Sequence, residues 1–175
     1  MNSLTLALLL TAVAADPCVS GPNVGQRPGP YSFTVATGAN RGKSTCYICE
    51  TADRPAVIVF SRKPSPELGK LLTRLESALN GQPADGLAAW VTVLGEAQSI
   101  DELADWAKAQ AVRTIPVGNF DDVDGPPTYR LAADAETTVV VFVKQKVTAN
   151  FALRSGELDD KAMSSILDAV NKIKK

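Results

Sequence analysis

The sequence of 175 residues contains no histidine, and this absence excludes several kinds of site. Without an imidazole there can be no Ser-His or Cys-His nucleophile, no histidine metal ligand and no histidine pH switch. An excess of either charge is also lacking, because 18 basic residues stand against 19 acidic ones and the formal net charge is −1. This balance indicates neither a nucleic-acid partner nor an anionic membrane.

No apolar run is long enough for a membrane span. The run at residues 4–15 (LTLALLLTAVAA) is shorter than the roughly 20 residues that a spanning helix needs. An apolar run followed by small residues is typical of a cleaved secretory signal, although no Lys or Arg precedes it here. We therefore expect a signal peptide over residues 1–15, a mature chain beginning near Asp16, and a secreted or periplasmic location. The alternative is a buried N-terminal strand or helix.

The length and composition, with 45% hydrophobic and 21% charged residues, fit one globular domain. Its centre is predicted at Ala56–Phe60 (AVIVF), which reads as a strand buried on both faces. Ser65 is a helix cap, and Pro66 suits the first turn of the helix that follows. Leucines at spacings of three and four give that helix one buried stripe: Leu68, Leu71, Leu72, Leu75 and Leu79.

The rest of the chain continues this alternation. A second strand at residues 88–94 requires a parallel, right-handed crossover, and Ser99 with Glu102 forms a capping box for a helix whose Trp106 belongs to the core. The remaining elements that we expect are a strand at 115–118, a helical piece at 129–133, a hairpin of 138–143 with 147–153, and a helix at 159–173.

This order, β-α-β-α followed by a hairpin and a last helix, resembles that of thioredoxin. TVVVFVKQKVTANFAL is similar to the hairpin segment of thioredoxins, and the added IPVG and GPPTYRLAADAE resemble the redoxin branch, with its peroxiredoxins and membrane-tethered thiol reductases. The resemblance covers residues 54–175 and implies an α/β, thioredoxin-like fold with a central mixed sheet flanked by helices. Residues 16–53, rich in Gly and Pro, are expected to form an arm with one edge strand.

The chain departs from the family where the family's chemistry lies. Thioredoxins carry a CxxC directly after the first core strand, but Pro64 and Glu67 stand at those two places here. Peroxiredoxins carry a threonine and a cysteine in the same turn, and both are missing, so we expect no peroxidase activity. Thr137 occupies the place of the family's cis-proline. Ser65 is interpreted as a cap and not as a nucleophile.

The remaining candidates for chemistry are Cys46 and Cys49, a CxxC (CYIC) on the arm before the core strand. Pro55 disfavours helical geometry at the residue before it, so we expect no stable helix to begin at Cys46. Activation by a helix dipole is then weak, although Arg41 and Lys43 supply some positive field.

Three interpretations of this pair stay open. The simplest is a structural disulfide that pins the arm. The second is a redox-active pair that exchanges with a protein thiol or disulfide, with Cys46 as the sulfur that holds the mixed disulfide. The third is copper(I), because even with Cys18 the chain supplies only three thiolates. The acidic turn at 120–125 lacks the distal Glu of a calcium loop and is interpreted as solvated.

Two function classes follow. One is a secreted thiol-disulfide or redox protein that acts through Cys46 and Cys49, and the other is a non-catalytic thioredoxin-fold module that binds a partner or a small molecule. No cofactor is expected for either class.

Overall fold

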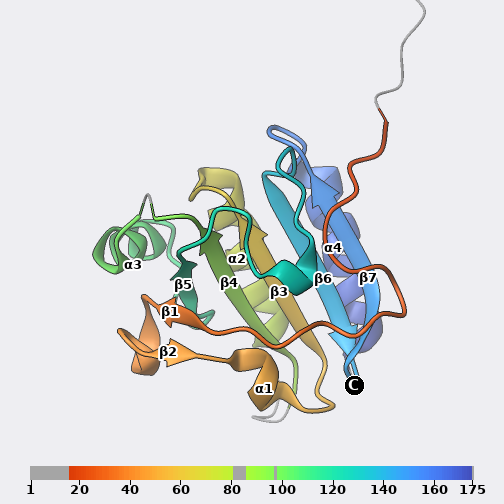
Figure 1. The fold of residues 1–175 in the computed structure, drawn as a ribbon, viewed down its shortest axis with the longest axis horizontal. Helices are drawn as coiled ribbons and strands as arrows, with labels where there is room; N and C mark the ends of the chain where they lie inside the picture. Colours follow the sequence, from red (N-terminus) through yellow and green to blue (C-terminus); the bar gives the residue numbers. More distant parts are fainter. Residues whose placement is uncertain (1–15, 81–85, 97, 175) are drawn as a thin grey trace, which may run out of the picture.

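The computed structural model describes residues 16–80, 86–96 and 98–174, so the expected signal peptide at 1–15 lies outside the described residues. The described chain forms one seven-stranded mixed sheet in the order β2-β1-β5-β4-β3-β6-β7 (Figure 1). The strands are β1 Phe33–Val35, β2 Ser44–Thr45, β3 Ala56–Ser61, β4 Ala88–Leu94, β5 Val117–Phe120, β6 Thr137–Val143 and β7 Lys146–Leu153. The helices are α1 Tyr47–Thr51, α2 Pro66–Leu79, α3 Ile100–Ala109 and α4 Asp160–Ile173, with 3-10 turns η1 Gly38–Asn40 and η2 Pro127–Tyr129.

The centre of the sheet agrees with the sequence prediction. β3 is buried along its whole length and pairs in parallel with β4 and antiparallel with β6. The side chain of Ser65 accepts a hydrogen bond from the amide of Leu68, and Ser99 and Glu102 form the predicted capping box. The expected α/β, thioredoxin-like order is therefore confirmed.

Two elements are displaced from their predicted bounds. The strand expected at 115–118 pairs with β4 only from Val117, because Pro116 has no amide hydrogen to donate to the sheet. The helical piece expected at 129–133 is instead the short turn η2, which ends because Arg130 has a left-handed φ of 50°.

One face of the sheet is covered by helices. Side chains of α2, α3 and α4 pack with those of the central strands into one aliphatic cluster. Trp106 packs against this cluster from α3, as the sequence predicts. Figure 1 shows α2 and α4 behind the sheet in this view.

The opposite face is covered by the arm, α1 and η2, and its cluster is rich in aromatic side chains. The arm supplies two strands where one edge strand was expected: β1 pairs with β5, and β2 is the outer neighbour of β1. The arm also bonds to β7, with the amide of Gly25 donating to Val147 (2.8 Å) and the amide of Val147 donating to Gln26 (2.9 Å). The arm thus shares the sheet, while a boundary near residue 53 stays a prediction.

Within the described part of the chain, no helix is both long and apolar enough to cross a membrane.

Candidate functional site

Cys46 and Cys49 form a disulfide on α1, with Cys46 at the N-cap position and the two Cα atoms 5.3 Å apart. The expectation that no helix could begin at Cys46 is wrong. The helix ends at Ala52, which has a φ of 48°, so the restriction that Pro55 places on Arg54 acts beyond the helix end. Because α1 has only five residues, few amide dipoles are aligned at its start.

Aromatic contacts hold the start of α1 against the sheet, and a local hydrogen bond closes its end. The ring centroid of Tyr47 lies 5.7 Å from that of Phe33 and 5.9 Å from that of Trp90. At the other end of the helix, the guanidinium of Arg54 donates to the carbonyl of Glu50 at 3.0 Å. The disulfide is therefore presented from a short helix whose first residue, Tyr47, packs on the sheet.

A buried network of neutral groups lies beneath α1. The indole N–H of Trp90 donates to the hydroxyl of Tyr31 at 2.8 Å, and that hydroxyl shares a second 2.8 Å hydrogen bond with Thr92. Burial raises the pKa of Tyr31 far above the usual range of a phenol, and the same holds for Tyr129. These phenols stay neutral, and their hydrogen bonds hold the arm in place.

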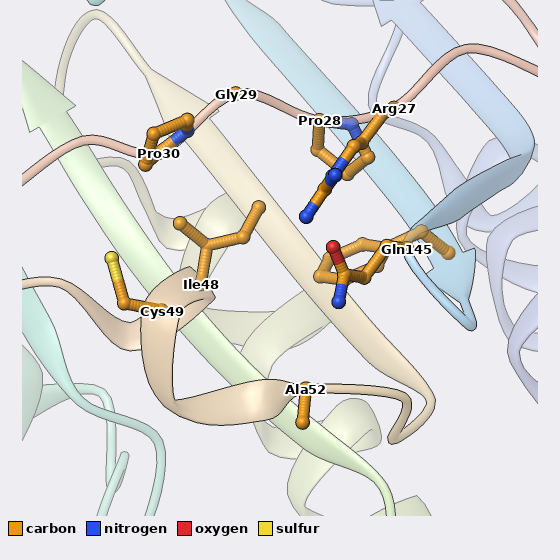
Figure 2. A pocket seen from close by; sticks show the side chains of 9 residues that line it. Arg27, Pro28, Gly29, Pro30, Ile48, Cys49, Ala52 and Gln145 are labelled. Atoms are coloured by element: carbon orange, nitrogen blue, oxygen red, sulfur yellow. The ribbon is translucent and has the colours of Figure 1, made fainter.

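Of the two cysteines in the disulfide, Cys49 is exposed and Cys46 is half-buried. Cys49 also lines a groove of about 490 Å³ between α1 and the arm. Figure 2 shows the arm on one side of this groove and α1 on the other. The other lining residues are Arg27, Pro28, Gly29, Pro30, Ile48, Ala52, Phe142 and Gln145.

The arm wall of the groove is rigid for local reasons. Pro28 and Pro30 fix their own φ angles, and the carbonyl of Gly29 between them accepts a hydrogen bond from Tyr129 at 2.9 Å. A Cβ at Gly29 would lie 2.4 Å from Oγ1 of Thr128, so only glycine allows this approach. The sequence interpretation missed this wall, and its only signal was the string RPGP in a stretch that reads as a loop.

The place where thioredoxins carry their CxxC is a turn without cysteine in this chain. After β3, the guanidinium of Arg62 donates to the carbonyls of Val123 (2.8 Å), Ala132 (2.8 Å) and Ala135 (3.0 Å). Lys63 pairs with Glu136 at 2.7 Å. This turn therefore fastens β3 to the segment before β6 and presents no thiol.

The second half of the family site is also changed. Thr137 begins β6 in the place of the cis-proline and is 3% exposed, and none of the described residues follows a cis peptide bond. Pro64 and Glu67, the two residues in the places of the missing cysteines, lie beside the Ser65 cap at the start of α2.

Cys18 lies apart from the disulfide. Its thiol contacts Asp134 at 3.9 Å, and Asp134 also pairs with Arg154 at 2.9 Å. Partial burial, followed by the negative charge of Asp134, raises the pKa of this thiol. The three cysteines are not brought together, and the described residues contain no group of three or more metal-ligating side chains. A copper(I) site would therefore have only the thiolates of Cys46 and Cys49.

The positive charges expected near the pair are only partly available. Arg41 forms an ion pair with Asp101 of α3 and donates to the carbonyl of Ala36 at 2.7 Å. The charge of Arg41 is thus largely neutralised by Asp101. In the acidic turn, the carboxylate of Asp122 accepts a hydrogen bond from the amide of Asp124 at 2.8 Å, as in an ordinary turn.

No protein-family model matches the sequence, and no curated protein matches it. Solved structures do resemble it. A candidate protein disulfide isomerase from Bacteroides thetaiotaomicron superposes with a TM-score of 0.68 at 15% identity, covering 88% of this chain and 91% of that one. Peroxidoxin BcpB from Mycobacterium tuberculosis gives 0.59 at 14% identity, covering 87% and 98%.

A secreted disulfide oxidoreductase from Mycobacterium tuberculosis, described as homologous to E. coli DsbE, gives a TM-score of 0.59 at 10% identity. The match covers 81% of this chain and 95% of that one. At such identities the likeness concerns the path of the backbone and not the residues of a site. Together with the strand order and the helix-covered sheet, it shows that the chain has a thioredoxin-like fold.

Proposed function

We propose that the chain is a thiol-disulfide redox protein that acts through the Cys46–Cys49 disulfide. The observation that carries this proposal is the position of Cys49, which is exposed and lines a groove beside an anchored helix. The usual thioredoxin position has no cysteine, and Arg62 holds its turn through three hydrogen bonds. Thiol-disulfide chemistry is therefore assigned to the disulfide on the arm. Resemblance to disulfide oxidoreductases supports the same reading.

The reaction is a two-electron exchange. A thiolate of a partner dithiol attacks one sulfur of the disulfide, and the other sulfur leaves as a thiolate. The second thiol of the partner then breaks the mixed disulfide. The partner ends oxidised, while Cys46 and Cys49 end as two thiols.

A location outside the cytosol fits this chemistry, because disulfides persist in oxidising compartments. One of the similar structures is of a secreted protein, and the apolar run at residues 4–15 has the composition of a signal. The intact mass of secreted protein should correspond to a chain that begins near Asp16.

A second candidate function is a non-catalytic binding module in which the disulfide is structural. It is favoured by the half-buried position of Cys46 and by the packing of Tyr47 between Phe33 and Trp90. In this case the pair serves to pin α1.

The reduction potential of the pair separates the two functions. The protein is equilibrated with dithiothreitol or glutathione buffers, and free thiols are counted by alkylation and mass spectrometry. A redox protein should have a potential less negative than about −300 mV, whereas structural disulfides lie below that value. It should also oxidise a reduced, unfolded model protein in stoichiometric amounts.

The double variant Cys46→Ser/Cys49→Ser is the control, since it keeps Cys18 and should oxidise nothing. A potential below about −300 mV together with no oxidation of the model protein would replace the redox proposal with the structural one.

A further inference from the structure

We propose that the groove beside the disulfide binds an extended partner segment with a cysteine, an apolar neighbour and a carboxylate, and delivers the cysteine to Sγ of Cys49. This inference rests on the proposed redox function and names its substrate class and its point of attack. The groove is not the family's usual site, because its walls are the arm and α1 and not the turn after β3.

The carboxylate is inferred from Arg27, the only charged residue in the groove wall. Arg27 is exposed, and none of the ion pairs among the described residues includes it. In Figure 2 its side chain extends from the arm toward Ile48 and Gln145. Two more exposed cations flank Gln145: Lys144 in the β6–β7 turn and Lys146 at the start of β7. A guanidinium that forms no ion pair with the described residues favours a carboxylate on the bound segment.

The apolar requirement follows from the rest of the lining. The uncharged lining residues are Pro28 and Pro30 of the arm, Ile48 of α1, Ala52 at its C-cap and the fully buried Phe142 of β6. The groove volume of about 490 Å³ is in the range that accommodates a few side chains. Because the arm wall is fixed by two prolines and by the Tyr129 hydrogen bond, the arm itself loses little conformational entropy when a segment binds.

Binding there brings the partner to Cys49 rather than to Cys46. Figure 2 places Cys49 and Pro30 toward one end of the groove and Arg27 and Gln145 toward the other. Cys46 does not line the groove and is half-buried. The partner thiolate therefore forms its bond to Sγ of Cys49, the Cys46–Cys49 bond breaks, and Cys46 leaves with the electron pair as a thiolate.

The test uses oxidised full-length protein and two blocked seven-residue peptides with a central cysteine and a leucine on each side. One peptide has glutamate at both ends and the other has lysine. The rate at which each opens the Cys46–Cys49 disulfide is divided by its rate with hydroxyethyl disulfide, which removes differences in thiol pKa. We expect the glutamate peptide to react about fivefold faster, the effect of roughly one exposed ion pair. Peptide mapping should find the mixed disulfide on Cys49.

Arg27→Glu should remove or invert this preference. Lys161→Glu, which makes the same charge change on α4 at the helix-covered face, should leave it intact. Exchange at equal rates with both peptides, or no effect of Arg27→Glu, would reject the groove while leaving the redox function in place. A mixed disulfide on Cys46 would reject the assigned point of attack. No opening by either peptide would overturn the redox function and, with it, this inference.

Discussion

The two faces of the sheet are covered by different side chains and different kinds of secondary structure. The face under α2, α3 and α4 is aliphatic and is assembled from regular helices with good caps. The face under the arm is aromatic and is closed by an irregular segment, the short helix α1 and a 3-10 turn. The disulfide, the groove and the buried Tyr31 network all lie on the second face.

This difference indicates that one face mainly stabilises the fold and the other presents the disulfide. A helix that buries a stripe of leucines stabilises a fold with few other demands on its sequence. Outside its two short strands the arm covers a hydrophobic face with irregular backbone, and it does so with prolines, buried hydroxyl groups and an edge-to-face ring contact. Backbone held in this way can present a disulfide in a groove, which the helix-covered face does not do.

The largest effect is expected from Leu72→Ala on the helix-covered face. Leu72 is fully buried in the aliphatic cluster, so its truncation should lower the free energy of unfolding by about 2 to 5 kcal/mol. Urea denaturation measures this loss, and Leu167→Ala, at a partly buried position of α4, should cost less. If the two faces are independent, the reduction potential of Cys46–Cys49 will be unchanged in Leu72→Ala. A shift of the potential would show that they are coupled.

A smaller effect is expected from Tyr31→Phe on the arm-covered face. The substitution removes the acceptor of the Trp90 indole N–H and the partner of Thr92, both buried. Leaving a buried donor unpaired should cost about 1.5 kcal/mol. Tyr47→Phe is the control, since the Tyr47 hydroxyl accepts only a 3.3 Å hydrogen bond from Asn40 at a partly buried site. Equal losses in the two variants would mean that the network does not stabilise this face.

The same contrast explains how far the sequence alone could predict the molecule. On the helix-covered face, leucine spacing, Ser65 and the Ser99 capping box each act within one or two turns of chain, so α2 and α3 could be predicted from local pattern. On the arm-covered face the deciding contacts are long-range. The hydroxyl groups of Tyr31 and Thr92 share a hydrogen bond, and the carbonyl of Gly29 accepts a hydrogen bond from Tyr129. No local pattern in the arm encodes such partners.

The candidate site was predicted in part. The CxxC pair is visible as a motif, and the disulfide that it forms agrees with the first and second interpretations. The helix at Cys46 was missed because the restriction by Pro55 was taken to extend into residues 46–51. Pro55 restricts only the residue before it, and the helix already ends at Ala52. Arg27 could not be recognised, because its place in the same groove as Cys49 exists only after the arm has folded over the sheet.

The smallest effect is expected from Glu76→Gln, which asks whether the two faces respond differently to acid. Glu76 of α2 accepts backbone N–H groups of Arg113 (2.7 Å) and Ile115 (3.0 Å), and a third from Thr114 between them. Burial acts to raise the pKa of this carboxyl, but the three N–H groups outweigh it and hold the pKa below its usual value. Glutamine keeps an acceptor oxygen but loses the charge, so we expect a loss of about 0.5 to 1 kcal/mol near neutral pH.

The sign of the pH dependence follows from that lowered pKa. The stabilisation by Glu76 is fully present above the unfolded-state pKa of about 4.3 and is lost as the pH falls through the lower folded pKa. Unfolding curves of wild type and Glu76→Gln should therefore converge in that acidic range, while Asp168→Asn, at an exposed position of α4, should differ little from wild type at pH 7. The cost of Tyr31→Phe should stay constant over the same range, because Tyr31, Trp90 and Thr92 do not titrate there. A gap between wild type and Glu76→Gln that stays open below the folded pKa would assign the effect to packing instead of charge.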